Sequence, residues 1–202
     1  MASAPPPVAG VLLAGGRATR MGGRDKAFAA VGGEPIAVRT VRLLHELFPQ
    51  VIVSTSRPER FRGLDVETVG DLFPARGPLA GIHAAMRASR HPHVFVVACD
   101  MPGLEAEVIR FLLARCGDAD AVVPEWEDDI EPLHALYAVR TLPVIEQCLA
   151  EGRHALRQFL PLIRVDYVPE RALRSVRGTA HSLTNVNTPE ELAAVGGSFD
   201  EA

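Results

Sequence analysis

Short apolar runs alternate with amphipathic segments along most of the chain. Val8 to Leu13 and Val94 to Ala98 are apolar runs without polar alternation, as expected of strands buried on both faces of a parallel sheet. Between them, Ile36 to Phe48 places apolar residues mostly at helical spacing. Pro35 suits the first turn of this helix, and Pro49 ends it. The pattern predicts strands that alternate with helices.

The rest of the chain continues this alternation. The other predicted strands are Val51 to Thr55, Asp65 to Val69, Ala121 to Pro124, Glu131 to Tyr137 and one near Arg164 to Val168. The other predicted helices run from Pro78 to about Ser89, Glu105 to Arg115, Leu142 to Ala150 and His154 to Leu160, with a last one from Pro189. No helical pattern precedes Glu131, so its strand is a candidate antiparallel member of the sheet.

These elements predict an α/β fold: a single-domain, Rossmann-like, doubly wound, mainly parallel mixed sheet with helices on both faces. The domain is expected over residues 8–195, after a disordered leader of residues 1–7 and before a frayed tail of residues 196–202. A length of 202 residues with 48% hydrophobic content suits one domain with a substantial core.

Charge and cysteine content exclude several classes of function. A net charge of -4 and a pI near 6.0 argue against nucleic-acid and acidic-membrane partners. Cys99, Cys116 and Cys148 form no C-x-x-C pair, so neither a disulfide framework nor a zinc site is indicated. The leader has no basic segment followed by a long apolar one, and no run is long enough to span a bilayer. We therefore expect a cytoplasmic protein.

A glycine-rich cationic loop follows the first strand. Gly15 and Gly16 allow backbone N–H groups to approach a bound group closely, and phosphate oxygens are a frequent ligand of such loops. The loop carries four cations within ten residues: Arg17, Arg20, Arg24 and Lys26. Lys26 is the only lysine of the chain, which indicates a need for a compact ammonium rather than a planar guanidinium. The loop therefore predicts a site for a polyanion.

Two carboxylates follow predicted strands and are expected at the same edge of the sheet. Asp100 follows the run Val94 to Ala98, and Asp71 follows Asp65 to Val69. In the common strand order 3-2-1-4, Asp100 lies beside the glycine loop and Asp71 lies farther along. We expect Asp100 to hold Mg²⁺ and Lys26 to neutralise phosphate oxygens of a nucleoside triphosphate. A phosphate-monoester acceptor would need no protein base, since its second pKa is ~6.

Near the C-terminus, Asn185-Val186-Asn187-Thr188-Pro189-Glu190-Glu191 contains a helix start. Thr188 and Glu191 form a capping box, with Pro189 at the first helical position. These residues thus have a structural explanation. Asn185 and Asn187 have none and are candidate site residues.

Five motifs together resemble the molybdenum cofactor guanylyltransferase family. They are L-A-G-G-x-x-x-R-M-G-G-x-D-K from Leu13 to Lys26, G-P-L-A-G from Gly77, C-D-M-P from Cys99, E-P-L-H-A-L-Y from Glu131 and N-V-N-T-P-E-E-L from Asn185. The resemblance runs from about residue 8 to residue 195. It implies transfer of GMP from GTP to the phosphate of molybdenum-bound molybdopterin, with release of pyrophosphate.

The resemblance also implies roles for individual residues. Nucleotide binding is expected at Leu13, Ala14, Gly15, Gly16, Lys26, Ser54, Asp71 and Asp100, catalysis at Arg20, Lys26 and Asp100, and Mg²⁺ binding at Asp100. Asn185 and Asn187 resemble the pterin-side asparagines of the family. Ser54 departs from the pattern, because the family often has asparagine at this strand end. A molybdenum insertion protein and an apo-molybdoenzyme chaperone are candidate protein partners.

Two other classes of function remain open on the sequence. The first is a cytidylyltransferase or a sugar-phosphate nucleotidyltransferase with the same fold. The second is a catalytically silent nucleotide-binding or partner-docking protein, against which the intact Lys26 and Asp100 argue. Pyrophosphate release with GTP, Mg²⁺ and molybdopterin distinguishes them.

Overall fold

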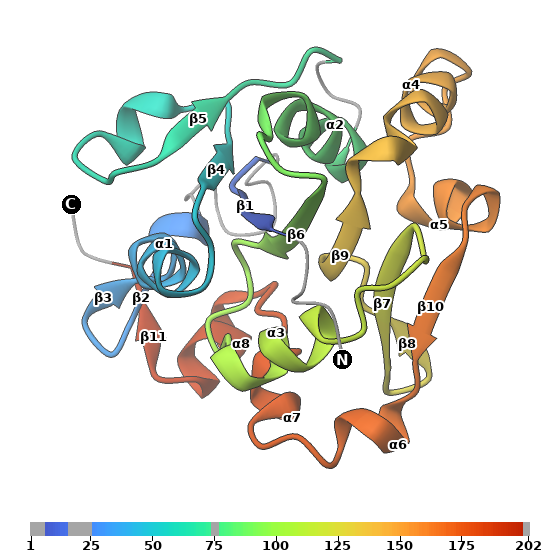
Figure 1. Ribbon diagram of the computed structural model, residues 1–202. Helices are drawn as coiled ribbons and strands as arrows, with labels where there is room; N and C mark the ends of the chain where they lie inside the picture. The colour runs from blue at the N-terminus through green and yellow to red at the C-terminus, as the bar shows by residue number, and fades with distance from the viewer. Residues whose placement is uncertain (1–6, 16–25, 74–76, 200–202) are drawn as a thin grey trace.

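The protein is described by a computed structural model over residues 7–15, 26–73 and 77–199. Its centre is an eight-stranded sheet of order β10-β7-β9-β6-β1-β4-β5, with β8 paired to β7 outside this path (Figure 1). The strands are β1 (Val8–Leu13), β4 (Val51–Ser54), β5 (Glu67–Val69), β6 (His93–Ala98), β7 (Ala121–Trp126), β8 (Asp129–Ile130), β9 (His134–Ala138) and β10 (Val165–Val168). The predicted leader lies outside the described residues except for Pro7.

Strand directions confirm a mainly parallel mixed sheet. β1 runs parallel to β4 and β6, and β4 runs parallel to β5, so the predicted order 3-2-1-4 holds for the first four strands. β9 runs antiparallel to both β6 and β7, and β10 runs parallel to β7. The predicted antiparallel strand is thus confirmed, although it begins at His134, because Pro132 and Leu133 lie in a turn.

Helices cover both faces of the sheet (Figure 1). α1 and α3 pack into one hydrophobic cluster, and α2, α4 and α5 pack into the other. The α-helices are α1 (Ile36–Leu47), α2 (Pro78–Ala88), α3 (Ala106–Leu113), α4 (Leu142–Ala150), α5 (Leu156–Phe159), α6 (Glu170–Leu173), α7 (Thr179–Ser182) and α8 (Pro189–Ala194). Short 3-10 helices are η2 (Lys26–Phe28), η3 (Pro58–Phe61), η4 (Val139–Thr141) and η5 (Leu160–Leu162).

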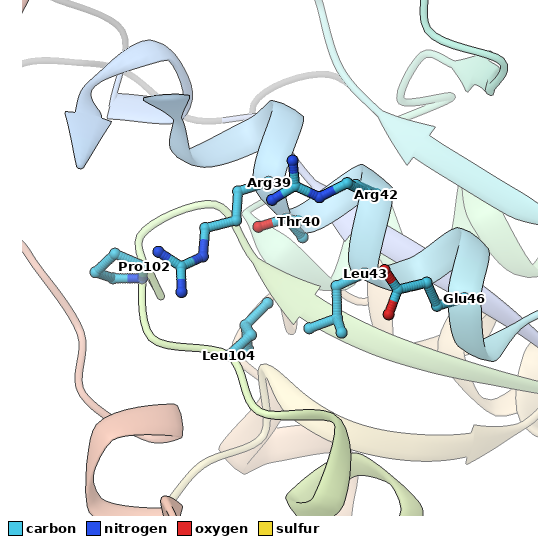
Figure 2. A pocket seen from close by; sticks show the side chains of 7 residues that line it. All are labelled: Arg39, Thr40, Arg42, Leu43, Glu46, Pro102 and Leu104. Carbon is cyan, nitrogen blue, oxygen red and sulfur yellow. The ribbon is translucent and has the colours of Figure 1, made fainter. Parts of the chain in front are cut away.

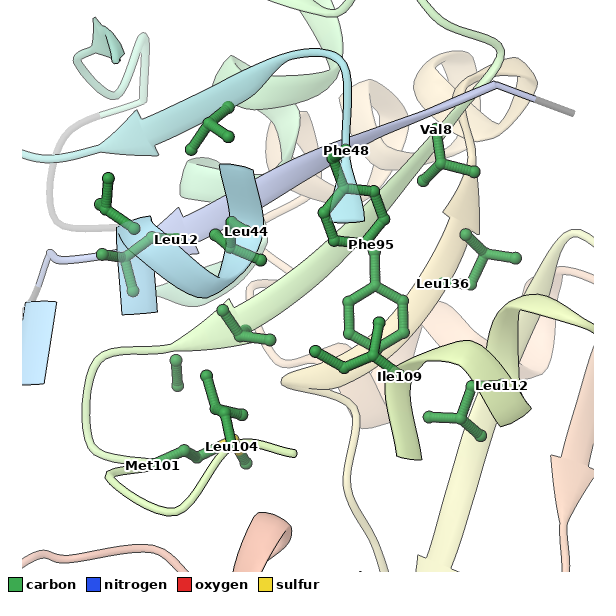
Figure 3. Close-up of a cluster of buried hydrophobic side chains, with 14 of the residues drawn as sticks. Val8, Leu12, Leu44, Phe48, Phe95, Met101, Leu104, Ile109, Leu112 and Leu136 are labelled. Atoms are coloured by element: carbon green, nitrogen blue, oxygen red, sulfur yellow. The ribbon is translucent and has the colours of Figure 1, made fainter. Parts of the chain in front are cut away.

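The two clusters take alternate side chains of the central strands. Leu12 of β1 joins the cluster under α1 and α3, whereas Val11 and Leu13 join the other one. Figure 3 shows the first cluster, in which Phe95 of β6 stacks against Phe48 at a centroid distance of 5.9 Å. This two-sided burial explains why the sequence of β1 shows no polar alternation.

A small second sheet lies beside α1 and was not expected from the sequence. β2 (Ala30–Val31) pairs with β3 (Glu34–Pro35) and with β11 (Gly197–Ser198), both antiparallel. Gly32 and Gly33 form the β2–β3 turn with φ values of 62° and 81°, which favour glycine. The expectation of a frayed tail from residue 196 is therefore corrected at Gly197 and Ser198, since backbone pairing with β2 orders them.

Other element boundaries also differ from the prediction. The helix expected over His154 to Leu160 is divided into α5 and η5, and α6 and α7 had no sequence signal that we recognised. Within the described part of the chain, no helix is both long and apolar enough to cross a membrane.

Candidate active site

The carboxyl ends of parallel strands meet in register at one edge of the sheet. Leu13 of β1 lies beside Ser54 of β4 and Ala98 of β6. Beyond the strands, the Ala14 N–H donates to the Ser54 carbonyl at 2.9 Å, and the Cys99 N–H donates to the Leu13 carbonyl at 3.2 Å. The predicted nucleotide-contacting residues of β1 and β4 are thus adjacent, with the chain toward Asp100 next to them.

Asp71 lies at the outer end of this edge. β5 is three strand positions from β6, a span of about 14 Å at ~4.8 Å between neighbouring strands. Asp71 follows β5 by two residues, and its Oδ1 accepts a hydrogen bond from the Ser54 hydroxyl at 3.3 Å. Ser54 therefore contacts the carboxylate that the sequence predicts at the nucleoside end.

Gly81, the fourth residue of α2, allows close packing at this end. A Cβ at position 81 would lie 2.9 Å from Ser54 Oγ, 3.2 Å from Leu13 Cδ2 and 3.6 Å from Asp71 Oδ1. Any side chain there would press on Ser54 and Leu13 and would touch Asp71. The G-P-L-A-G motif thus brings α2 against the ends of β1 and β4.

The surroundings of Asp71 raise the pKa of its carboxyl group. The residue as a whole is exposed, but partial desolvation of the carboxylate raises the pKa, and the hydrogen bond from Ser54 opposes this to a smaller extent. A desolvated acceptor is suited to bind donor groups of a ligand, because such donors replace the water that it has lost.

Asp100 lies two residues beyond β6, and its backbone is hydrogen-bonded to the segment that contains Asn185 and Asn187. The Val186 N–H donates to the Asp100 carbonyl at 2.8 Å. Val186 is buried in a small cluster with Ile36 and Leu192. Because Val186 is held by this hydrogen bond and by the packing of its side chain, Asn185 and Asn187 flank a fixed point next to Asp100.

Glu131 belongs to this group of residues, although the sequence did not single it out as a site residue. The Asn185 amide nitrogen donates to both Glu131 carboxylate oxygens, at 3.4 Å and 3.3 Å. Burial raises the pKa of Glu131, the Asn185 bond lowers it, and the negative charge of Asp100 raises it further. Glu131, Asn185 and Asp100 therefore gather at the β6–β9 side of the edge.

A hydrogen bond from the first turn of α8 holds the backbone of Asn187. The Glu191 carboxylate accepts from the N–H groups of Asn187 and Thr188, at 2.5 Å and 3.2 Å, and the Thr188 hydroxyl accepts from the Glu191 N–H at 3.2 Å. This confirms the predicted capping box, with Pro189 at the first helical position. The Glu191 carboxylate reaches one residue farther than a capping box requires, because it also accepts from the N–H of Asn187, a candidate site residue.

The cationic loop is described only at its ends. Gly16 and Arg20 lie outside the described residues, and of Lys26 the structure describes the backbone, as the first residue of η2. η2 is anchored to η3, since the rings of Phe28 and Phe61 are 5.3 Å apart and the Arg60 guanidinium lies 4.1 Å from the Phe28 ring centroid. The roles of Gly16, Arg20 and Lys26 stay predictions.

A pocket lies between α1 and the loop that follows Asp100. Figure 2 shows it between α1 and the loop after β6, with the Arg39 guanidinium extended toward Pro102. Its volume is about 140 Å³, below the ~300–1,000 Å³ of most small-molecule sites, so it cannot enclose a nucleotide. Arg42 on its rim is engaged by Glu34 at 2.8 Å. The strand ends, rather than this pocket, are therefore the candidate active site.

The described residues fit a metal only together with a ligand. They contain no group of three or more His, Cys, Asp or Glu side chains that could hold an ion by themselves. Mg²⁺ in nucleotide enzymes typically takes one or two carboxylates and completes its shell with substrate phosphates and water. Asp100, partly exposed after a parallel strand, suits that mode of binding.

Fold and site together indicate a nucleotide-binding protein. An open α/β sheet binds its ligand beyond the carboxyl ends of its parallel strands, which is where Asp71 and Asp100 lie. The solved 2-C-methyl-D-erythritol 4-phosphate cytidylyltransferase from Thermus thermophilus shares this fold, with a TM-score of 0.68 over 92% of this chain and 95% of that chain, at 16% identity. That likeness concerns the fold alone.

Sequence relatives identify the family. The MobA-like NTP transferase domain matches residues 10–168. A probable molybdenum cofactor guanylyltransferase from Pelotomaculum thermopropionicum is 38% identical over 91% of this chain and 89% of its own length, and a molybdenum cofactor guanylyltransferase from Desulfosudis oleivorans is 36% identical over 92% of each. The chain therefore belongs to the molybdenum cofactor guanylyltransferases, within the MobA-like nucleotidyltransferases.

A solved structure agrees with this assignment. The molybdopterin-guanine dinucleotide biosynthesis protein A from Archaeoglobus fulgidus superposes with a TM-score of 0.80 over 93% of this chain and 96% of that chain, at 26% identity. The resemblance drawn from the five sequence motifs is thus confirmed at the level of family, fold and enzyme class.

Proposed function

We propose that this enzyme transfers GMP from GTP to the terminal phosphate of molybdenum-bound molybdopterin and releases pyrophosphate. The observation that supports the proposal is the single edge of the sheet at which β5, β4, β1 and β6 end, with Asp71, Ser54, the start of the glycine loop at Ala14 and Gly15, and Asp100 beyond or at these strand ends. Names of the relatives support guanine as the base and molybdenum cofactor as the acceptor.

Asp71 and Ser54 would hold the nucleoside, and Leu13, Ala14, Gly15, Gly16 and Lys26 would hold the triphosphate. An oxygen of the acceptor phosphate forms the new bond to the α-phosphorus, and the bond from that phosphorus to the oxygen bridging to the β-phosphate breaks. Pyrophosphate leaves with the electron pair. The acceptor phosphate is largely ionised at neutral pH, so the chain needs to align the two anions rather than supply a base.

Arg20 and Lys26 would offset the charge of the triphosphate, and Asp100 would hold the metal. Mg²⁺, when bound there, supplies Lewis-acid neutralisation of phosphate oxygens. Asn185 and Asn187 would contact the pterin side of the acceptor. Because GTP is made inside the cell, we place the reaction in the cytoplasm, where a molybdenum insertion protein would deliver the acceptor and an apo-molybdoenzyme chaperone would take the product.

Pyrophosphate release with GTP, Mg²⁺ and molybdenum-molybdopterin tests the proposal. Asp100→Asn keeps the shape of the side chain and removes its charge, so we expect the fold to persist and transfer to fall by much more than tenfold. Asp118→Asn, at an exposed site before β7 at the opposite edge of the sheet, is the matched control and should keep wild-type turnover. Turnover of Asp100→Asn within about tenfold of wild type, roughly 1.4 kcal/mol of barrier, would contradict the proposed role.

A further inference from the structure

The Glu131–Asn185 contact joins two segments that are distant in the sequence and gives Glu131 a role beyond packing. Asn185 is a candidate for acceptor binding, and its amide nitrogen faces the Glu131 carboxylate. An ionised carboxylate only accepts hydrogen bonds, so the amide must turn its nitrogen toward Glu131. The Asn185 Oδ1 atom is thereby directed away from Glu131.

That oxygen is available to a ligand. Asn185 is partly exposed, and no residue in the described part of the chain donates a hydrogen bond to its Oδ1 atom. An acceptor with a fixed direction next to Asp100 matches a donor edge of a ligand, such as the ring N–H and exocyclic amine of a pterin. A freely rotating amide would offer donor and acceptor alternately to the same position.

Glu131 stands on a rigid support. Its N–H donates to the Pro124 carbonyl at 2.9 Å, and its carbonyl accepts from the His134 N–H at 3.2 Å. The next residue is pinned as well, because the buried Tyr137 hydroxyl donates to the Pro132 carbonyl at 2.7 Å. A carboxylate held in this way can impose an orientation on its partner, as supporting hydrogen bonds do for active-site ligands in general.

We propose that Glu131 is a positioning residue that fixes the Asn185 amide so that its oxygen is presented to the donor edge of the acceptor substrate. This inference rests on the proposed function for the identity of that substrate. It assigns Glu131 an effect on acceptor binding and none on GTP binding.

Steady-state kinetics with two variants and their combination test the proposal. Glu131→Gln no longer fixes the amide of residue 185, and its own NH₂ can donate to Asn185 Oδ1 and occupy that oxygen. The hydrogen bond from this oxygen to the substrate is then lost, so KM for molybdenum-molybdopterin should rise about tenfold while KM for GTP stays within about twofold. Asn185→Ala should give a similar rise, and Glu131→Gln should add nothing in the Asn185→Ala background. Glu107→Gln, an exposed carboxylate on α3, is the control and should match wild type.

A reciprocal exchange gives a sharper test. In Glu131→Gln combined with Asn185→Asp, the new amide at 131 donates to the new carboxylate at 185, which again presents an acceptor oxygen. This variant should recover most of the lost acceptor affinity, whereas a merely structural role of the negative charge at 131 predicts no recovery. Independent, additive effects of the single variants, or an equal rise of KM for GTP, would overturn the proposal.

The side-chain amide of Asn185 provides a readout that does not depend on activity. In ¹⁵N-edited spectra of the wild-type protein its NH₂ protons should be protected from exchange, and Glu131→Gln should reduce that protection. Protection unchanged in the variant would refute the pairing. If wild-type protein shows this protection but no transfer to molybdopterin, the proposed function fails while the orientation of Asn185 by Glu131 stands.

Discussion

The buried side chain of His134 should lower the free energy of unfolding in mild acid. His134 of β9 is fully buried, and its ring lies edge-on to Phe95 at a centroid distance of 5.5 Å. Neither ring nitrogen has a hydrogen-bond partner among the described residues, and burial lowers the pKa of His134 to about 3. The unfolded chain, in contrast, has a histidine pKa near 6.5.

The direction of the effect follows from the protons bound in each state. Above pH 6.5 the ring is neutral in both the folded and the unfolded state, so its protonation takes nothing from the free energy of unfolding. Between pH 6.5 and about 3 only the unfolded state takes up the proton, so stability falls as the pH falls. At pH 5 the loss from this one residue is about 2 kcal/mol, at 1.36 kcal/mol for each pH unit below 6.5. That is a sizeable part of the ~5–15 kcal/mol typical of a domain.

His134→Leu removes the titrating ring and keeps an apolar side chain in the core. Urea unfolding at pH 7.5 and pH 5.0 gives the free energy of unfolding at each pH, and the quantity compared is the difference between them. We expect the wild type to lose about 2 kcal/mol more than His134→Leu over this interval. His93, whose pKa is also lowered by burial and by the charge of Arg140, adds to the loss equally in both proteins.

His45→Leu, on the exposed side of α1, is the control, since it makes the same substitution outside the core, and its loss of stability between the two pH values should match that of the wild type. The reasoning is refuted if His134→Leu loses as much stability between pH 7.5 and 5.0 as the wild type does. That result would mean that the buried ring takes up its proton without cost.

Three further predictions concern the site. Gly81→Ala should raise KM for GTP about tenfold, because the new Cβ at position 81 would press on Ser54 and Leu13, while the circular dichroism spectrum stays unchanged. An unchanged KM would refute this packing role of Gly81. Lys26→Arg should lower kcat/KM at least tenfold, since a guanidinium fork does not replace a compact ammonium, and wild-type kinetics would show that the lone lysine is incidental. Thr188→Ala should cost about 1 kcal/mol in urea unfolding through loss of the α8 cap, and a change below ~0.3 kcal/mol would speak against the capping box.

The fold was predictable where local pattern and tertiary burial agree. β1 and β6 are buried on both faces, so their apolar runs gave both their identity and their central place in the sheet. α1 was recognisable from its spacing and from Pro35 and Pro49. The small sheet was not, because two-residue strands show no alternation and β11 pairs with a segment that precedes it by more than 160 residues.

The candidate site was predictable to the extent that strand ends determine it. Asp71 and Asp100 follow strands, and Ser54 ends one, and the order of these strands could be inferred; the structure brings Asp71 and Ser54 into contact. Glu131 was missed as a site residue because it follows an acidic stretch that reads as solvated and precedes its strand by three residues. Its partner Asn185 is 54 residues away, and no local pattern reports such a contact. The signal that could have found it is the glutamate that opens E-P-L-H-A-L-Y.

The central claim is that the enzyme joins GMP, and not another nucleotide, to molybdenum-molybdopterin. Incubation of the wild-type enzyme with Mg²⁺, molybdenum-molybdopterin and equal concentrations of GTP and CTP, followed by mass spectrometry of the extracted cofactor, tests it directly. We predict the guanine dinucleotide as the main product, with one pyrophosphate released per dinucleotide formed. A main product with cytosine, or pyrophosphate release without any dinucleotide, would contradict the account.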